Sequence, residues 1–135
     1  MRTQHLSIEE YGTIAAQVLA APTQDLLATC DTVALLAALE APAAGIDGYE
    51  VYPTVAAKAS ALVYRLCRTR PLLDGNQRAA LMALYEYLDL NGYQWTGHPS
   101  DDTDNVVTVL KELAAGNVTE KELTDWISAR IGGLE

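Results

Sequence analysis

The segment from residue 70 to residue 78, Arg-Pro-Leu-Leu-Asp-Gly-Asn-Gln-Arg, concentrates the side chains that could do chemistry. Proline disfavours helix at the residue before it and Asp-Gly-Asn is typical of a turn, so a bend is expected before a helix that starts at about Asn76. The first amides of a helix have no partner within it and lie at the positive end of its dipole. Gly75, Asn76 and Gln77 would offer such amides to a phosphate, and Arg78, one turn further on, would add a bidentate donor.

Asp74 adds a carboxylate to this predicted phosphate site. Carboxylate oxygen suits magnesium, a hard cation, and it can also orient a hydroxyl group, so Asp74 is a candidate metal ligand and a candidate catalytic residue. A purely structural interpretation stays open beside this one. In that interpretation Asp74 caps the helix, Gly75 only turns the chain and Arg78 points into solvent.

The charge of the chain is distributed unevenly. The 135 residues include 18 acidic and 9 basic side chains, and the formal net charge is −9. A protein that binds nucleic acid by neutralising phosphates needs a basic surface, so this balance argues against that class of function. Residues 58–78, however, hold one acid and five cations, a net charge of +4, which suits a small anion such as a nucleotide, or an acidic peptide. The five cations are Lys58, Arg65, Arg68, Arg70 and Arg78.

Helices are expected to position these residues, because signals for strands are nearly absent. Ser7 with Glu10 and Thr119 with Glu122 have the spacing of capping boxes, which mark helix starts. Apolar residues recur at three- and four-residue spacing between the starts and the prolines and glycines that end each pattern. Helices are expected at about 8–20, 31–40, 54–69, 76–90, 103–115 and 119–131, with a short extended piece at 93–96. The expected class is all-α, a compact bundle of about six helices in one domain spanning residues 1–135.

Composition also bears on compartment and core. No apolar run reaches the roughly 18 residues of a membrane span, and the N-terminus lacks the continuous apolar stretch of a signal peptide. A soluble, cytoplasmic protein without a membrane partner is therefore expected. The two cysteines, Cys30 and Cys67, lack metal-ligand spacing, and Cys67 falls on an apolar helical face that predicts a core position. Trp95 and Trp126 are expected to pack the C-terminal helices.

The segment 70–78 resembles HPFxDGNKR, the motif of the Fic/Doc family, and the match extends beyond it. The pattern is similar to the Doc (death-on-curing) branch over roughly residues 31 to 95, and the small size of the chain is also similar to Doc. In order along the chain, the further matches are Asp31, Leu35-Leu36, Tyr52-Pro53, Lys58-Ala59, the apolar helix 62–66 and Asn91-Gly92-Tyr93. This resemblance implies the Fic/Doc fold.

The resemblance also implies an activity and partners. Fic-fold enzymes transfer part of a nucleoside triphosphate, ATP or similar, to a protein hydroxyl, and the histidine of the motif takes the proton from that hydroxyl. Most Fic proteins move the nucleotidyl group, whereas Doc toxins move the terminal phosphate to a translation factor, elongation factor Tu, and are blocked by an antitoxin. The positions implied for nucleotide binding are Gly75, Asn76, Gln77 and Arg78, with Asp74 as a candidate Mg²⁺ ligand.

Three positions depart from the family motif. Arg70 stands at the histidine, Leu72 at the phenylalanine and Gln77 at the lysine, which removes one positive charge. A histidine suits the general base because its ordinary pKa, about 6.5, leaves neutral imidazole available at cellular pH. The guanidinium of an arginine stays protonated and offers no lone pair, so Arg70 cannot be the base. A Doc-like transfer is therefore expected to be slower by at least about 10²–10⁴-fold.

Three explanations of Arg70 stay open. It can mark the inactivated form of a lethal toxin, since histidine to arginine needs one base change. It can mark a degenerate homologue that binds a nucleotide or a protein without catalysis. It can also stabilise transition-state charge while another group accepts the proton. The chain is interpreted as an impaired or inactive Doc-like toxin, with a non-catalytic homologue and a Fic-type nucleotidyltransferase as alternatives.

Other positions near the motif have structural and functional interpretations. Tyr49 and Tyr52 precede the helix at 54–69, where the family places a flap for the target peptide, although they could instead cover a core edge. Lys58 matches a recurrent Doc lysine and equally suits a partly buried structural cation. Arg65 and Arg68 are expected on a solvated helix face.

Overall fold

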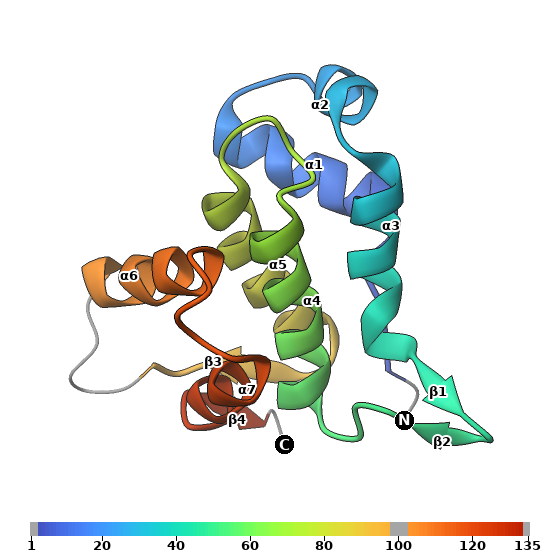
Figure 1. Ribbon diagram of the computed structural model, residues 1–135, viewed down its shortest axis with the longest axis vertical. Helices are drawn as coiled ribbons and strands as arrows, with labels where there is room; N and C mark the ends of the chain where they lie inside the picture. The colour runs from blue at the N-terminus through green and yellow to red at the C-terminus, as the bar shows by residue number, and fades with distance from the viewer. Residues whose placement is uncertain (1–2, 98–102, 134–135) are drawn as a thin grey trace.

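The computed structural model describes residues 3–97 and 103–133. These residues form seven α-helices and a 3-10 turn, with four strands of two or three residues each (Figure 1), so the predicted all-α class is confirmed. The helices are α1 (Ile8–Leu19), α2 (Thr23–Thr29), α3 (Thr32–Glu40), α4 (Val55–Thr69), α5 (Asn76–Leu90), α6 (Thr103–Ala114) and α7 (Glu120–Ser128); the 3-10 turn is η1 (Ala41–Ala43). The strands are β1 (Gly45–Ile46), β2 (Tyr49–Glu50), β3 (Tyr93–Trp95) and β4 (Ile131–Gly133).

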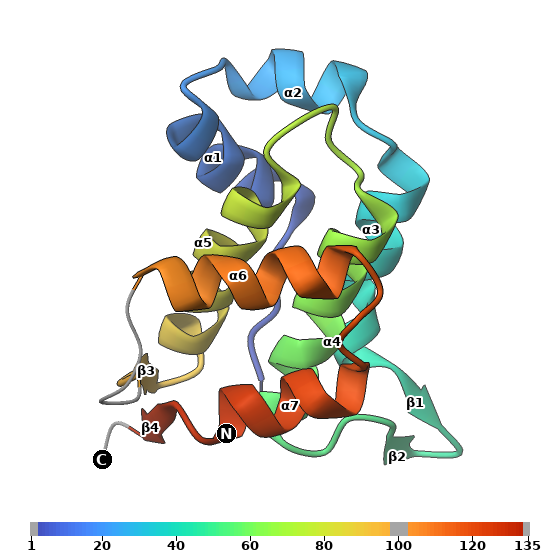
Figure 2. The ribbon, with the colours of Figure 1, turned by 60° about the vertical axis from the view of Figure 1, so that its left-hand side comes forward.

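The centre of the bundle is α4, which packs against α3, α5, α6 and α7. Figure 2 shows α6 and α7 on one side of it, with α3 behind. Alanines such as Ala59 and Ala83 are fully buried between these helices, because a side chain without γ atoms lets neighbouring backbones approach closely. Cys67 is also fully buried and belongs to the core, as its position on the apolar face predicts. Trp95 of β3 packs against Trp126 of α7 with ring centroids 5.2 Å apart, and both pack against the core, as expected of residues that pack the C-terminal helices.

Both predicted capping boxes are present. In α1 the Ser7 hydroxyl accepts from the Glu10 N–H at 3.1 Å, and the Glu10 carboxylate accepts from the Ser7 N–H at 3.1 Å. Thr119 and Glu122 make the same reciprocal pair at the start of α7, at 3.0 Å each. Side chains thus fix the starts of these helices locally, which is why the sequence alone locates them.

The structure differs from the expected elements at two places. Residues 21–30 contain α2, a helix that was not predicted, whose N-cap residue is Pro22. Proline is compatible with a helix start because its missing N–H would have no helical partner there. The last helix ends at Ser128 rather than near 131, because β4 pairs antiparallel with β3. The partner strand lies more than thirty residues away, and local periodicity does not report it.

No single helix within the described residues is long and apolar enough to cross a membrane. Residues 23–29 and 32–43 are long and apolar enough only when taken together, and the chain bends by 104° between them.

Candidate functional site

The motif segment forms the connection between α4 and α5 at one end of the bundle (Figure 1). α4 ends at Thr69, and its C-cap residue, Arg70, has left-handed backbone dihedrals of φ 48° and ψ 63°. Gly75, with φ 74°, is the N-cap residue of α5. Six residues, 70–75, therefore separate the two helices, and the predicted bend before Asn76 is confirmed. We call residues 70–75 the motif loop.

Two main-chain anchors hold the motif loop. The Asn76 side chain folds back onto Leu72, where its Nδ2 donates to the Leu72 carbonyl at 3.0 Å and its Oδ1 accepts from the Leu72 N–H at 2.9 Å. The Pro71 carbonyl accepts from the Asp31 N–H, just before α3, at 2.7 Å. Asn76 is only 7% exposed, so the side chain predicted to bind nucleotide is used to shape the loop. What it leaves for a ligand is its backbone amide.

Gly75 is required by contact as well as by conformation. Its positive φ belongs to the left-handed region, which side chains disfavour. A Cβ atom at this position would lie 2.1 Å from Leu19 Cδ2. The start of α5 is therefore packed directly against the end of α1.

The N-terminus of α5 is open to an anion. No side chain caps it, and the first of its N–H groups that bonds within the helix is that of Ala79, to the Gly75 carbonyl at 3.0 Å. The amides of Asn76, Gln77 and Arg78 precede that bond. The Asp74 carboxylate accepts from the Gly75 N–H at 2.8 Å, so Asp74 bonds the turn rather than the helix. These amides and the helix dipole favour a bound phosphate.

A cleft of about 230 Å³ lies beside the motif loop and is lined by Asp74 and Arg78 at its polar part. Its apolar part comes from Leu19 of α1, Leu26 of α2 and the motif-loop residues Leu72 and Leu73, and Thr29 of α2 also lines it. Leu19, Leu26 and Thr29 are three lining residues that sequence reasoning missed. Prediction of a helix at 23–29 would have been the signal that points to the α2 residues among them. α2, the helix that was not predicted, lies over the motif loop in Figures 1 and 2 and contributes Leu26 and Thr29 to the lining of this cleft.

Three of the five clustered cations bond to protein groups. Buried Lys58 donates to the Tyr52 carbonyl and pairs with Glu50 at 3.2 Å, as expected of a structural cation. Arg68 donates to the Ala114 carbonyl at the end of α6, at 3.1 Å. The expected solvated face for Arg68 and its neighbour Arg65 is therefore wrong in part.

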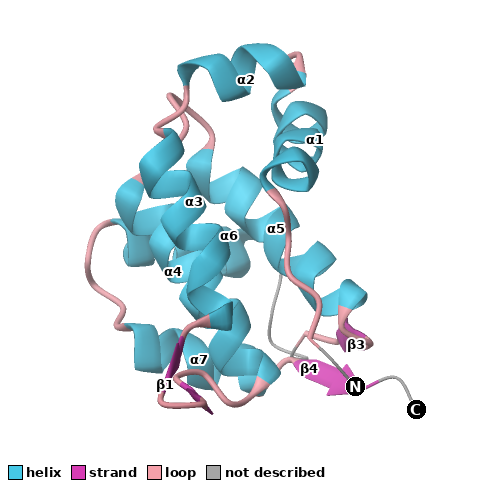
Figure 3. Cartoon of the chain, turned by 90° about the vertical axis from the view of Figure 1, so that its right-hand side faces the viewer, coloured by secondary structure: helices cyan, strands magenta, loops and turns pink. Residues whose placement is uncertain are grey.

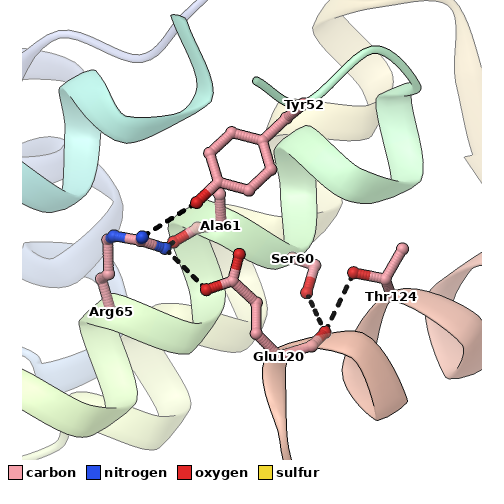
Figure 4. A network of polar contacts seen from close by, with 6 residues as sticks. All are labelled: Tyr52, Ser60, Ala61, Arg65, Glu120 and Thr124. Atoms are coloured by element: carbon pink, nitrogen blue, oxygen red, sulfur yellow. Dashed lines mark hydrogen bonds and ion pairs between the residues drawn. The ribbon is translucent and has the colours of Figure 1, made fainter. Parts of the chain in front are cut away.

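Arg65 is the hub of a polar network between α4, α7 and the segment before α4 (Figure 4). It donates to the Tyr52 hydroxyl at 2.9 Å and to the Glu120 carboxylate at 3.1 Å. The Glu120 carbonyl in turn accepts from Ser60 at 3.0 Å and from Thr124 at 2.9 Å. Arg65 joins the two helices and is not available to a ligand.

Arg70 and Arg78 are the two clustered cations left over. Both are exposed, and neither has a hydrogen bond or ion pair with the part of the chain that the structure describes. Of the five cations that the sequence places in residues 58–78, these two, one at each end of the motif, are therefore the ones without a partner in the described part of the chain. Gln77, at the family lysine position, is half-buried between them along the chain.

The β1–β2 hairpin does not lie beside the motif loop, so the interpretation of Tyr49 and Tyr52 as part of a flap over the site is not supported. The hairpin precedes α4 and the motif loop follows it. Because α4 has 15 residues, its two ends, and with them the hairpin and the loop, lie about 22 Å apart along the helix axis. Figure 3 shows α2 at one end of the molecule and the hairpin at the other. Tyr49 is 80% exposed there, whereas Tyr52 bonds to Arg65.

The part of the chain that the structure describes contains no cluster of side chains that could enclose a metal ion. Among the described residues, no three His, Cys, Asp or Glu side chains come together as ligands. Asp74 supplies one exposed carboxylate, with its Oδ1 bonded to the Gly75 N–H. Because Mg²⁺ keeps several waters and commonly shares carboxylate and phosphate oxygens, Asp74 fits a metal delivered with a nucleotide and does not fit a resident metal.

The chain is similar in sequence to a curated toxin. No family model and no solved structure matches the chain. Among curated proteins, Toxin Doc of Mycolicibacterium smegmatis is 33% identical over 98 residues, which are 73% of this chain and 71% of that protein. Identity at this level over most of both chains agrees with the ordered motif matches. The chain belongs to the Doc toxin family.

Proposed function

We propose that this chain is the toxin member of a toxin–antitoxin pair, with a nucleoside triphosphate site at the motif loop and impaired phosphotransfer to a translation factor such as elongation factor Tu. One observation carries the proposal: the uncapped start of α5 adjoins a cleft that Asp74 and Arg78 line. An antitoxin is the expected partner, since the relative is named as a toxin of the Doc type.

The phosphate end of the nucleotide would lie against α5. The free amides of Asn76 and Gln77 supply fixed donors, and the exposed guanidinium of Arg78 supplies a mobile bidentate one. The apolar side chains Leu19 and Leu26 would contact the uncharged part of the ligand. When bound, Mg²⁺ would neutralise phosphate charge from a position next to Asp74.

Arg70 sets the limit on catalysis. It can attract a phosphate, but it cannot accept the proton of the attacking hydroxyl. Phosphoryl transfer depends strongly on positioning and electrostatics, so a residual rate is expected. Because Arg70 and Gln77 both depart from the motif, a non-catalytic nucleotide- or protein-binding homologue is the second candidate function.

Calorimetry with ATP, GTP and their non-hydrolysable analogues tests the binding site. We expect Arg78→Ala to weaken binding about tenfold or more, because a charge-assisted bidentate bond contributes about 1.5–3 kcal/mol. Lys111→Ala removes an exposed cation from α6 and is the matched control, expected to leave binding unchanged. Equal losses in the two variants would show that only net charge matters.

Restoring the histidine tests the transfer. We expect Arg70→His to label elongation factor Tu from γ-labelled ATP at least about 10²-fold faster than the unmodified chain and to arrest growth when expressed. Label from the α-phosphate would instead indicate nucleotidyl transfer. If Arg70→His labels no protein of a cell lysate from either position and does not arrest growth, the transferase proposal fails. Measurable turnover by the unmodified chain would exclude the non-catalytic candidate.

A further inference from the structure

A second cleft lies at the C-terminal end of α5, far from the motif loop. It has a volume of about 670 Å³ and is open to solvent between the last turns of α5 and strand β3. Its walls carry three aromatic rings, Tyr85, Tyr93 and Trp95, and two carboxylates, Glu86 and Asp89. We call it the β3 cleft. Its volume falls in the range of pockets that hold a ligand or a short peptide segment.

The aromatic wall is fixed by packing. The Trp95 ring lies 5.5 Å from the Tyr85 ring and 5.2 Å from the Trp126 ring, centroid to centroid. On the far member of this row, the Arg130 guanidinium lies 4.7 Å from the centre of the Trp126 ring. An aromatic row that already holds one guanidinium, and whose rings need not reorganise, is suited to hold another.

The two carboxylates of the β3 cleft have no cationic partner among the described residues. Glu86 and Asp89 are exposed and three positions apart on α5, which places them on one side of the helix. Neither carboxylate makes a hydrogen bond or an ion pair with any residue of 3–97 or 103–133, and no cation is among the residues that line the cleft. The cleft therefore combines negative charge with aromatic faces, in a chain whose net charge is −9. This combination is complementary to a cation that also has a flat, weakly hydrated surface, which describes a guanidinium.

The shape of the cleft favours an extended occupant. Four consecutive residues, Tyr93 to Thr96, line it along the direction of β3. Gln94 lies opposite Gly132 of β4, and the Thr96 N–H donates to the Arg130 carbonyl at 2.8 Å. Since main-chain groups alternate in direction along an antiparallel pair, those of Tyr93 and Trp95 point away from β4. A free strand edge of this kind can pair with an added strand.

We propose that the β3 cleft docks an extended, arginine-bearing segment of a partner protein, with the arginine stacked on the aromatic wall and paired with Glu86 or Asp89. This proposal is independent of the nucleotide site, because the motif loop lies at the other end of α5. Failure of either proposal leaves the other standing.

Fluorescence anisotropy with defined peptides tests the docking. The probe is a fluorescein-labelled nonapeptide of alternating valine and arginine, and its matched partners carry glutamine or glutamate in place of arginine. We expect the full chain to bind the arginine peptide at least about tenfold more tightly than the glutamine peptide, and not to bind the glutamate peptide. The double variant Glu86→Gln/Asp89→Asn is expected to weaken binding roughly three- to tenfold, as for two partly exposed ion pairs.

A variant with the same change in net charge separates the cleft from the overall field. Glu9→Gln/Asp25→Asn removes two exposed acids on α1 and α2 and is expected to bind the arginine peptide like the unmodified chain. An equal loss in both double variants would overturn the proposal in favour of non-specific attraction. Competition by spermidine as effective as that by unlabelled peptide would overturn it in favour of a small-cation site. Circular dichroism of both variants confirms that they are folded.

Discussion

Asn76 and Leu72 are joined by a reciprocal pair of hydrogen bonds, in which the Asn76 side-chain amide both donates to and accepts from the Leu72 main chain. This pair is buried at the base of the motif loop, so its loss would leave a main-chain N–H and carbonyl without partners. We expect Asn76→Ala to lower the free energy of unfolding by about 2 kcal/mol. Urea unfolding measures this, and Gln24→Ala, an exposed amide on α2, is the control expected to stay within about 0.5 kcal/mol of the unmodified chain.

Replacing Gly75 is expected to destabilise the fold in two separable ways, by backbone strain and by a clash with Leu19. Gly75→Ala forces a side chain into the left-handed region and onto Leu19, and we expect a loss of about 2–4 kcal/mol in unfolding free energy. Gly48→Ala has the same left-handed strain, with φ 82°, but nothing within 4 Å of the new Cβ. It is expected to cost only about 1–2 kcal/mol. Equal losses at the two glycines would show that the Leu19 contact relaxes freely.

Tyr49, in strand β2, and Tyr52, just after that strand, provide a matched pair of tyrosines for testing the network around Arg65. Tyr52→Phe removes the hydroxyl that accepts from Arg65, and we expect a loss of about 1 kcal/mol in thermal or urea unfolding. Tyr49→Phe removes an exposed hydroxyl and is expected to change stability little. If the two variants were equally stable, the network around Arg65 would not contribute to the fold.

His5 predicts a dependence of stability on pH. Its Nδ1 lies 3.1 Å from the Tyr87 hydroxyl, and burial, followed by the Lys58 ammonium, lowers the pKa of His5, with Glu50 acting in the opposite direction. Below about pH 6.5, the ordinary histidine value, the unfolded chain binds a proton that the folded chain does not. The contribution of neutral His5 is therefore complete above pH 6.5 and declines as the pH falls towards its lowered value.

Comparing His5→Gln with the unmodified chain isolates this contribution. We expect the difference in unfolding free energy between the two proteins to shrink between pH 7 and pH 5. A difference that is constant over this range, or that grows as the pH falls, would contradict the lowered pKa. Titration of the His5 ring protons by NMR provides an independent measurement.

Local signals located most of the helices. The two capping boxes depend on side chains three residues apart, and the bend at Asp74-Gly75 depends on the conformational freedom of its own residues. Such signals need no distant partner, so the sequence predicts them correctly. The short helix α2 lacks a side-chain cap, and β4 forms against β3 from a distant part of the chain, so neither had a comparable signal.

The candidate site also has features that the sequence predicts and features that depend on the tertiary structure. The sequence by itself determined the motif, its resemblance to the Doc branch and the loss of a general base at Arg70, because these depend on residue types in order. Only the tertiary structure decided which cations are free, since Lys58, Arg65 and Arg68 find partners on other segments. It also decided that α1 and α2, rather than the hairpin, wall the cleft beside the loop. Hydrogen-bond partners and packing surfaces come from residues far apart in the chain, and spacing along the sequence does not report them.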